Sequence, residues 1–214
     1  MLQTPVSAAS SASDAVTLLD AIAIRTPSRA FEVAERIAAV LFITVLTAIA
    51  AQVSVPLPFT PVPFTLQPMI VLLGGAALGA RLGATSQLAY LALGIAGLPV
   101  FAASATLPPG AARLLGPTGG YLISYPIAAF VVGKLAERGF DRRYGTATLA
   151  MASGLAIVFA CGIAWLGLVG RPAVGVGQAL AAGFFPFVLA DLVKLLAAAA
   201  VLPGLWRLIG RRAS

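Results

Sequence analysis

Two side chains of opposite charge, Asp191 and Lys194, stand in the most apolar part of the sequence, "ADLVKLLAAAA" at positions 190–200. Side chains three residues apart lie on one face of a helix, where a carboxylate and an ammonium reach each other. A charged group at the centre of a membrane helix costs about 2.5–3.5 kcal/mol and normally faces a cavity or a partner. The pair therefore predicts either an ion pair that fixes helix packing or a polar binding site.

Metal and nucleophilic chemistry lack their usual residues in this chain. The sequence has no His and a single Cys, Cys161, which excludes zinc sites and the common hydrolase triads. No G-x-x-x-x-G-K-[ST] motif is present, so the chain does not itself hydrolyse a nucleotide by the P-loop route. We expect no enzyme activity, no metal and no cofactor, with an intramembrane enzyme that uses Asp191 and Lys194 as the alternative from another class.

The elements that position this pair are membrane helices. Of the 214 residues, 60% are hydrophobic and 10% charged, with a mean hydropathy of +0.99, whereas soluble domains carry about 25% charged residues. The apolar residues form long runs, and about 20 such residues cross a bilayer. The sequence predicts an all-α integral membrane protein with six transmembrane helices. They cover about 37–53, 66–80, 82–100, 119–135, 146–169 and 186–202.

Basic residues predict the orientation of these helices. The net charge of +7 is not interleaved with aromatic residues in a patch, so we expect no nucleic-acid partner. Alternate connections hold Arg113 and Arg171, whereas the others carry most of the positive charge, which favours the cytoplasmic side. Both termini are then cytoplasmic, and the outward connections are 54–65, 101–118 and 170–185. The inward set is Arg25, Arg29, Arg36, Arg81, Lys134, Arg138, Arg142, Arg143, Arg207, Arg211 and Arg212.

The ends of the chain differ from its membrane part. Residues 1–30 are predicted to form a flexible cytoplasmic tail, because the Ser- and Ala-rich start lacks the features of a signal peptide. Residues 31–205 form the six-helix substrate-binding domain, and 206–214 form a basic cytoplasmic tail. Counted from Pro186, Asp191 lies roughly 7–8 Å below the outer start of its helix.

The first outward connection, "SVPLPFTPVPFTLQPM", has five prolines between positions 56 and 68. Repeated proline removes backbone donors and fixes φ, which gives a stiff, extended segment. With Phe59, Phe64, Thr65 and Gln67, this segment is either a lid over an apolar ligand or a rigid connector.

Polar side chains inside the spans need partners from the protein or from a ligand. Gln87 and Tyr90 share one side of their helix, and either hydrogen bonds between helices or ligand binding would satisfy them. Tyr121 is expected to anchor its helix at the membrane interface. Glycines repeat every four residues in "GGAALGARLG" at 74–83, which predicts close helix packing.

Four stretches resemble one family, the BioY proteins, which are the biotin-binding S components of energy-coupling factor (ECF) transporters. They occur in the family's order and together cover most of residues 37–203. The stretches are "PFTPVPFTLQ" (58–67), "LGARLGATSQLAYLALGIAGLPVFA" (78–102), "GPTGGYLI" (116–123) and "DLVK" (191–194).

The resemblance implies a cell-membrane protein that captures biotin from outside and delivers it to the cytoplasm. Its partners would be a transmembrane coupling protein and two ABC-type ATPases, and biotin is the transported substrate. Asp191 and Lys194 match the family's D-x-x-K motif, which lines the vitamin site. The T-L-Q segment matches Thr65, Leu66 and Gln67 as a cover. The third span and the loop after it match at Tyr90 and Phe101.

The sequence departs from the family's pattern in the loop 103–113, "ASATLPPGAAR", which replaces a glycine-rich stretch, and at Ala190, where a Gly is common. The coupling protein would dock on small residues of the first span. Two registers fit that role, one at Ala30, Ala34 and Ala38 and another at Ala39, Ile43 and Thr47.

The chemistry of biotin fits these residues. Asp191 can accept hydrogen bonds from the ureido N–H groups, and Lys194 can donate to the ureido oxygen or to the tail carboxylate. Arg113 is a candidate for that carboxylate from the outer loop. Which end of biotin each charge holds stays open, and an S component for another vitamin is the alternative substrate assignment.

Overall fold

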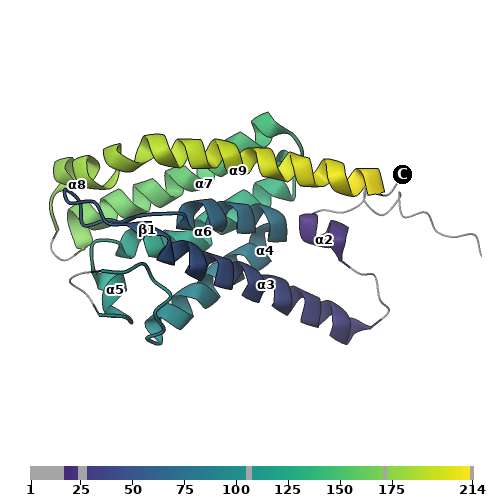
Figure 1. Cartoon of the computed structure of the whole chain (residues 1–214), viewed down its shortest axis with the longest axis horizontal. Helices are drawn as coiled ribbons and strands as arrows, with labels where there is room; N and C mark the ends of the chain where they lie inside the picture. Colours follow the sequence, from purple (N-terminus) through teal and green to yellow (C-terminus); the bar gives the residue numbers. More distant parts are fainter. Residues whose placement is uncertain (1–16, 24–27, 105–107, 171–172, 213–214) are drawn as a thin grey trace, which may run out of the picture.

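The computed structural model describes residues 17–23, 28–104, 108–170 and 173–212 as a bundle of helices (Figure 1). Its long helices lie along one direction, with α5, α8 and β1 at one end of the molecule and α2 near the other (Figure 1). In chain order the elements are α2 (Leu18–Ile22), α3 (Arg29–Gln52), β1 (Ser54–Val55), β2 (Phe64–Thr65), α4 (Gln67–Ile95), α5 (Ala112–Leu115), α6 (Gly119–Ala136), the 3-10 helix η1 (Phe140–Arg142), α7 (Tyr144–Ala164), the π-helical turn η2 (Trp165–Val169), α8 (Val176–Gly183) and α9 (Phe185–Arg212).

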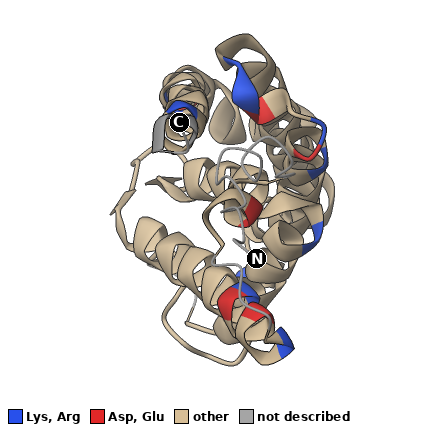
Figure 2. Cartoon of the chain, turned by 90° about the vertical axis from the view of Figure 1, so that its right-hand side faces the viewer, with Lys and Arg blue, Asp and Glu red and all other residues tan. Residues whose placement is uncertain are grey.

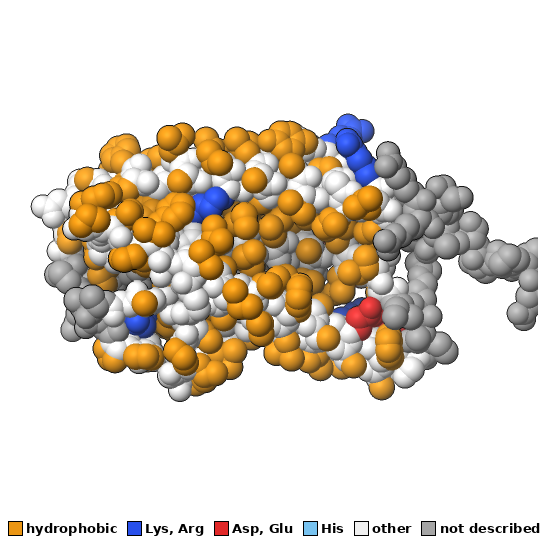
Figure 3. Space-filling model, in the orientation of Figure 1, with side chains coloured by type: hydrophobic (Ala, Val, Ile, Leu, Met, Phe, Trp, Pro, Cys, Tyr) orange, Lys and Arg blue, Asp and Glu red, His pale blue; other side chains and the backbone are white. Residues whose placement is uncertain are grey.

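Five of these helices are long and apolar enough to cross a membrane, which confirms the predicted all-helical membrane class. Hydrophobic side chains cover much of the face of the molecule that Figure 3 shows. On α3 this outer surface includes Leu41, Phe42, Val45 and Ile49, which are more than half exposed. Side chains of this kind face lipid without loss, because the acyl chains are as apolar as they are.

The predicted spans 66–80 and 82–100 lie in one element, α4, which is interrupted at Gly79. There the backbone leaves helical geometry, with φ 80° and ψ 177°. The chain folds back at this point. The evidence is a contact between the two arms: Gln67 Nε2 donates a hydrogen bond to the Tyr90 hydroxyl at 2.7 Å, although 23 residues separate the two. A Cβ on Gly83 would lie 2.7 Å from the Cα of Gly75. Glycine therefore permits both the reversal and the close contact of the two arms.

The reversal at Gly79 is held by Glu137, the residue that follows α6. Its Oε1 accepts a hydrogen bond from the Ala80 N–H at 2.9 Å, and its Oε2 pairs with Lys134 at 3.0 Å. Burial acts in the opposite direction, but these two partners keep the pKa of Glu137 below its usual value. The carboxylate satisfies a free backbone donor at the start of the second arm.

The opposite end of the molecule from α5 and α8 is rich in charged groups (Figure 2). Asp141 of η1 is buried there, and its Oδ2 accepts a hydrogen bond from Trp206 Nε1 of α9 at 2.6 Å. The Arg142 guanidinium lies 4.7 Å from the centre of the Trp206 ring. These contacts attach the last turns of α9 to the connection between α6 and α7.

Helices extend into both predicted tails. Within 1–30, α2 begins with a capping box between Thr17 and Asp20, and Leu18 and Leu19 are buried against the bundle. Residues 1–16 lie outside the described part. At the other end α9 continues as a helix to Arg212, so the expected tail at 206–214 begins inside that helix. The apolar pattern stopped earlier than the helix because the last turns carry arginines.

We predict that Gly79→Ala lowers the stability of the protein. The conformation of Gly79 is one that essentially only glycine adopts, and other residues there cost about 1–3 kcal/mol. A Cβ would also lie 2.9 Å from Thr17 Cγ2 and 3.0 Å from Glu137 Oε1. The midpoint of thermal unfolding in detergent measures the effect.

Gly204→Ala is the matched control, because Gly204 is helical and a Cβ there would meet nothing within 4 Å. We expect its midpoint to stay the same or to rise. An equal loss in both variants would contradict the role given to Gly79.

Candidate functional site

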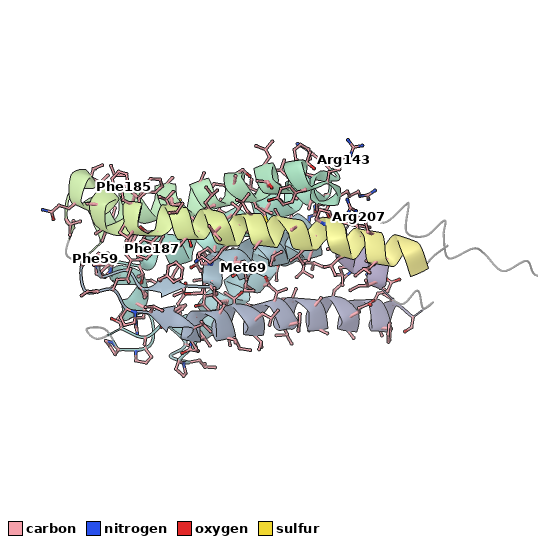
Figure 4. All side chains as sticks on the ribbon, turned by 45° about the horizontal axis from the view of Figure 1, so that its top comes forward. Phe59, Met69, Arg143, Phe185, Phe187 and Arg207 are labelled. Atoms are coloured by element: carbon pink, nitrogen blue, oxygen red, sulfur yellow. The ribbon has the colours of Figure 1, made fainter. Side chains whose placement is uncertain are left out.

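A cavity of about 300 Å³ lies at the end of the bundle that carries α5 and α8. All three predicted outward connections meet there, since Thr60 donates to the Ala182 carbonyl at 2.6 Å and Arg113 also lines the cavity. Phe59, Phe185 and Phe187 lie toward this end, whereas Arg143 and Arg207 lie toward the other (Figure 4). Apolar side chains make much of the wall, namely Val62, Phe101, Leu122, Val158, Phe159 and Phe187. Such a volume suits one small molecule.

Asp191 lines this cavity and forms an ion pair with Lys194 one helical turn further along α9. The two side chains are only 8% and 13% exposed. Lys194 itself does not appear among the residues that line the cavity. The carboxylate thus faces the cavity, while the ammonium lies behind it.

Lys194 connects α9 to the proline-rich connection. Its Nζ donates to the Thr65 carbonyl at 2.7 Å and lies 3.9 Å from the centre of the Phe64 ring. The Phe64 ring in turn stacks on Phe187 of α9, with 6.4 Å between the ring centres. Lys194 therefore has three partners and fixes the cover of the cavity against α9.

The cover is a hairpin. Ser54 and Val55 pair with Thr65 and Phe64 as two short antiparallel strands, and the proline-rich segment forms the loop between them. Thr65 and Gln67 line the cavity, whereas Phe59 at the tip is 66% exposed. The proline-rich segment, which we expected to be stiff, forms one wall of the cavity. This position favours a lid over a plain connector.

Tyr90 supports the opposite wall and does not line it. Its hydroxyl accepts from Gln67 Nε2 at 2.7 Å and donates to the Val100 carbonyl at 3.1 Å. Its ring packs edge-on against Phe101, with 5.4 Å between the centres. Tyr90 thus holds two lining residues, Gln67 and Phe101, in position.

Arg113 of α5 provides a positive charge on the cavity wall. Its Nε donates to the Pro108 carbonyl at 3.1 Å and its Nη1 to the Ala102 carbonyl at 2.9 Å. Burial lowers the pKa of the Arg113 guanidinium from its usual value, but an arginine remains charged at neutral pH. Among the described lining residues the charged ones are Asp191 and Arg113, so the cavity offers one acceptor and one donor of full charge.

The comparisons with known proteins identify the family. The chain matches the BioY family over residues 20–211. This chain belongs to the BioY family. A probable biotin transporter BioY of Pyrococcus horikoshii is 41% identical to it over 161 residues, which are 75% of this chain and 90% of the relative. The biotin transporter BioY of Thermotoga maritima is 39% identical over 158 residues, 74% of this chain and 88% of the relative.

A solved structure has the same fold as this BioY chain. It is the crystal structure of the S-component for biotin from an ECF-type ABC transporter, and it superimposes with a TM-score of 0.73 at 26% identity. The match covers 85% of this chain and 95% of that chain. The family and the apolar helices make this BioY chain a multi-pass membrane protein, and its relatives are named as transporters, not enzymes.

The structure brings five of the predicted site residues of this BioY chain onto one cavity: Asp191, Arg113, Thr65, Gln67 and Phe101. Gln87 lies elsewhere, since its Nε2 donates to Thr47 of α3 at 3.3 Å and to Ser86 at 3.1 Å. Gln87 thus makes the hydrogen bond between helices that the sequence offered as one alternative, while its Oε1 is buried without a partner among the described residues. Within the 103–113 loop, residues 105–107 lie outside the described part.

Two tyrosines of α6 line the cavity, and sequence reasoning missed both as site residues. Tyr121 was expected at the membrane interface, but it is buried and its hydroxyl donates to the Gly183 carbonyl at 2.8 Å. Tyr125, one turn further along, is 3% exposed. A phenol within an apolar span needs a partner, and that signal, which was applied to Tyr90, would have found Tyr125 as well.

The two sets of residues considered as docking sites for the coupling protein on the first span differ in exposure. Ala30, Ala34 and Ala38 are exposed on α3. Ile43 and Thr47 are buried, and Thr47 accepts a hydrogen bond from Gln87 of α4. The second set therefore faces the bundle.

We predict that Lys194→Met destabilises the protein by roughly 3 kcal/mol or more, because it leaves the Asp191 carboxylate buried without its cation. The same change removes the donor to the Thr65 carbonyl. The matched variant is Asp191→Asn combined with Lys194→Met, which removes both charges. Thermal unfolding should show that the double variant is more stable than Lys194→Met alone. Losses that simply add would show that the two charges are not coupled.

Proposed function

We propose that this chain is the S component of an ECF-type transporter and captures biotin in the cavity between its outer connections and α9. The observation that carries the proposal is that Asp191 and Arg113 place opposite charges on the wall of a small, largely apolar cavity. The relatives of the chain are named biotin transporters. Biotin is itself a mostly apolar molecule with a polar ureido ring at one end and a carboxylate at the other.

The two charges suit opposite ends of this ligand. Asp191 is an acceptor and takes the ureido N–H groups, while Arg113 is a cation and takes the tail carboxylate. Phe101, Phe159 and Phe187 enclose the apolar part in between. Lys194 acts through Asp191 as a positioning residue, because its ammonium is committed to Asp191 and to the Thr65 carbonyl.

We further infer that the chain crosses the membrane six times, with both termini in the cytoplasm. The reversal at Gly79 divides α4 into two arms, which supports six crossings. Basic residues gather at the end away from the cavity, as the positive-inside rule requires of the cytoplasmic side, and the cavity then opens outward. The membrane concerned is the plasma membrane, where an uptake protein meets external biotin.

Release of biotin to the cytoplasm requires energy that this chain does not supply. We infer that a transmembrane coupling protein and two ABC-type ATPases supply it. The exposed side of α3 that carries Ala30, Ala34 and Ala38 is the proposed docking face, because small exposed residues let a partner helix approach closely.

Calorimetry with the purified protein tests the substrate and its direction in the cavity. We expect Asp191→Asn to weaken binding of biotin at least tenfold, about 1.4 kcal/mol, and to weaken biotin methyl ester equally. Arg113→Gln should weaken biotin by a similar factor but leave the ester unchanged, because the ester has no carboxylate for the guanidinium to bind.

Thermal unfolding of both variants controls for loss of the fold. Unchanged biotin affinity in Asp191→Asn would remove the ligand role and leave an ion pair that only packs helices. An equal loss for biotin and ester in Arg113→Gln would contradict the assignment of the carboxylate to Arg113.

Labelling of single cysteines tests the orientation. In a chain with Cys161 replaced by Ala, Phe59→Cys should react with a membrane-impermeant thiol reagent added to intact cells, because Phe59 is exposed at the cavity end. Arg143→Cys and Arg138→Cys should react only after permeabilisation. Reaction of either arginine position in intact cells would reverse the proposed topology.

A further inference from the structure

Tyr125 carries a hydroxyl to which the function proposed above gives no role. The side chain is 3% exposed and lines the cavity. Among the described residues, no hydrogen bond to this hydroxyl is found. A phenol on the wall of a largely apolar cavity takes its hydrogen-bond partner from whatever occupies that cavity, water or a ligand.

Tyr121, by contrast, has a partner within the chain. The two tyrosines are four residues apart on the same face of α6, and both line the cavity. The Tyr121 hydroxyl is committed to the carbonyl of Gly183, the last residue of α8, at 2.8 Å. The Tyr125 hydroxyl, one turn deeper, is left for whatever occupies the cavity.

Tyr125 and Asp191 lie at matching depths. Tyr125 stands six residues after Gly119, the start of α6, and Asp191 six residues after Phe185, the start of α9. At 1.5 Å per residue both are about 9 Å below the starts of their helices, and the Tyr121–Gly183 bond joins α6 to the end of α8, just before the start of α9. The two groups therefore face the same part of the cavity.

A ureido ring presents two N–H donors and one carbonyl acceptor, and Asp191 as a carboxylate can satisfy only the donors. Three other donors at this end, from Lys194, Gln67 and Thr60, already have acceptors. Lys194 donates to Thr65 and pairs with Asp191, while the Gln67 amide nitrogen donates to Tyr90. Thr60 donates to the Ala182 carbonyl. The hydroxyls of Thr65 and Thr118 also line the cavity, and no acceptor for them is found among the described residues. Tyr125 is the donor that we take further, because it lies one turn below Tyr121 and at the depth of Asp191.

We propose that the Tyr125 hydroxyl donates a hydrogen bond to the ureido carbonyl oxygen of biotin and makes the site selective for that oxygen. The inference rests on the proposed function and extends it, since it names the group that reads the carbonyl. Asp191 and Tyr125 together then recognise both the donors and the acceptor of one ring.

The test compares biotin with 2-thiobiotin, in which sulfur, a much weaker acceptor, replaces the ureido oxygen. Affinities are measured by calorimetry for the wild-type chain, Tyr125→Phe and Tyr121→Phe. We expect the wild-type chain to prefer biotin about tenfold. Tyr125→Phe should lose about tenfold in biotin affinity and bind the thio analogue almost as the wild type does, so that the preference disappears. Tyr121→Phe, the matched control, should keep the preference even where its stability falls.

Two results would overturn the inference while leaving the proposed function intact. One is a wild-type chain that binds both ligands equally, and the other is a Tyr125→Phe variant that keeps the preference, for example by losing both ligands to the same extent. Failure of the wild-type chain to bind biotin at all would instead overturn the proposed function, and this inference with it. Thermal unfolding of each variant separates loss of the fold from loss of a contact.

Discussion

In the apolar interior of the bundle, the Asp191 carboxylate and the Lys194 ammonium can remain charged only because each has the other as a partner. This constraint determines much of the site around them. Lys194 also holds the Thr65 carbonyl and the Phe64 ring, so the proline-rich hairpin is fixed over α9. The carboxylate is left facing a cavity with Arg113 on its wall. One ion pair thus positions both the cover of the cavity and an acceptor inside it.

Polar contacts also join other elements of the bundle, although Gln87 Oε1 and Asp141 Oδ1 are buried without a hydrogen-bond partner among the described residues. The helix reversal at Gly79 exposes a backbone N–H at Ala80, and the Glu137 carboxylate accepts it. Trp206 donates to Asp141 at the same end, and Gln87 joins α4 to Thr47 of α3. Polar partners between elements therefore fix how the helices sit, while the apolar surfaces toward lipid impose little direction.

Much of this arrangement could be predicted from the sequence because the signals were strong and local. The length of apolar runs predicted the helices, and the cost of burying Asp191 and Lys194 predicted that they face a cavity or each other. The sequence could not separate those two outcomes, and the structure has both at once. It also could not predict α2 or the helical end of α9, because their stability comes from packing and capping instead of an apolar run. Tyr125 was missed because an isolated aromatic in a span resembles ordinary core.

The most direct test of the account is native mass spectrometry of the purified protein after incubation with biotin. We expect one intact biotin per chain, a smaller bound fraction when Asp191 is replaced by Asn, and an otherwise unchanged protein mass. Absence of bound biotin, or recovery of a chemically altered ligand, would contradict the claim that this cavity captures biotin for transport.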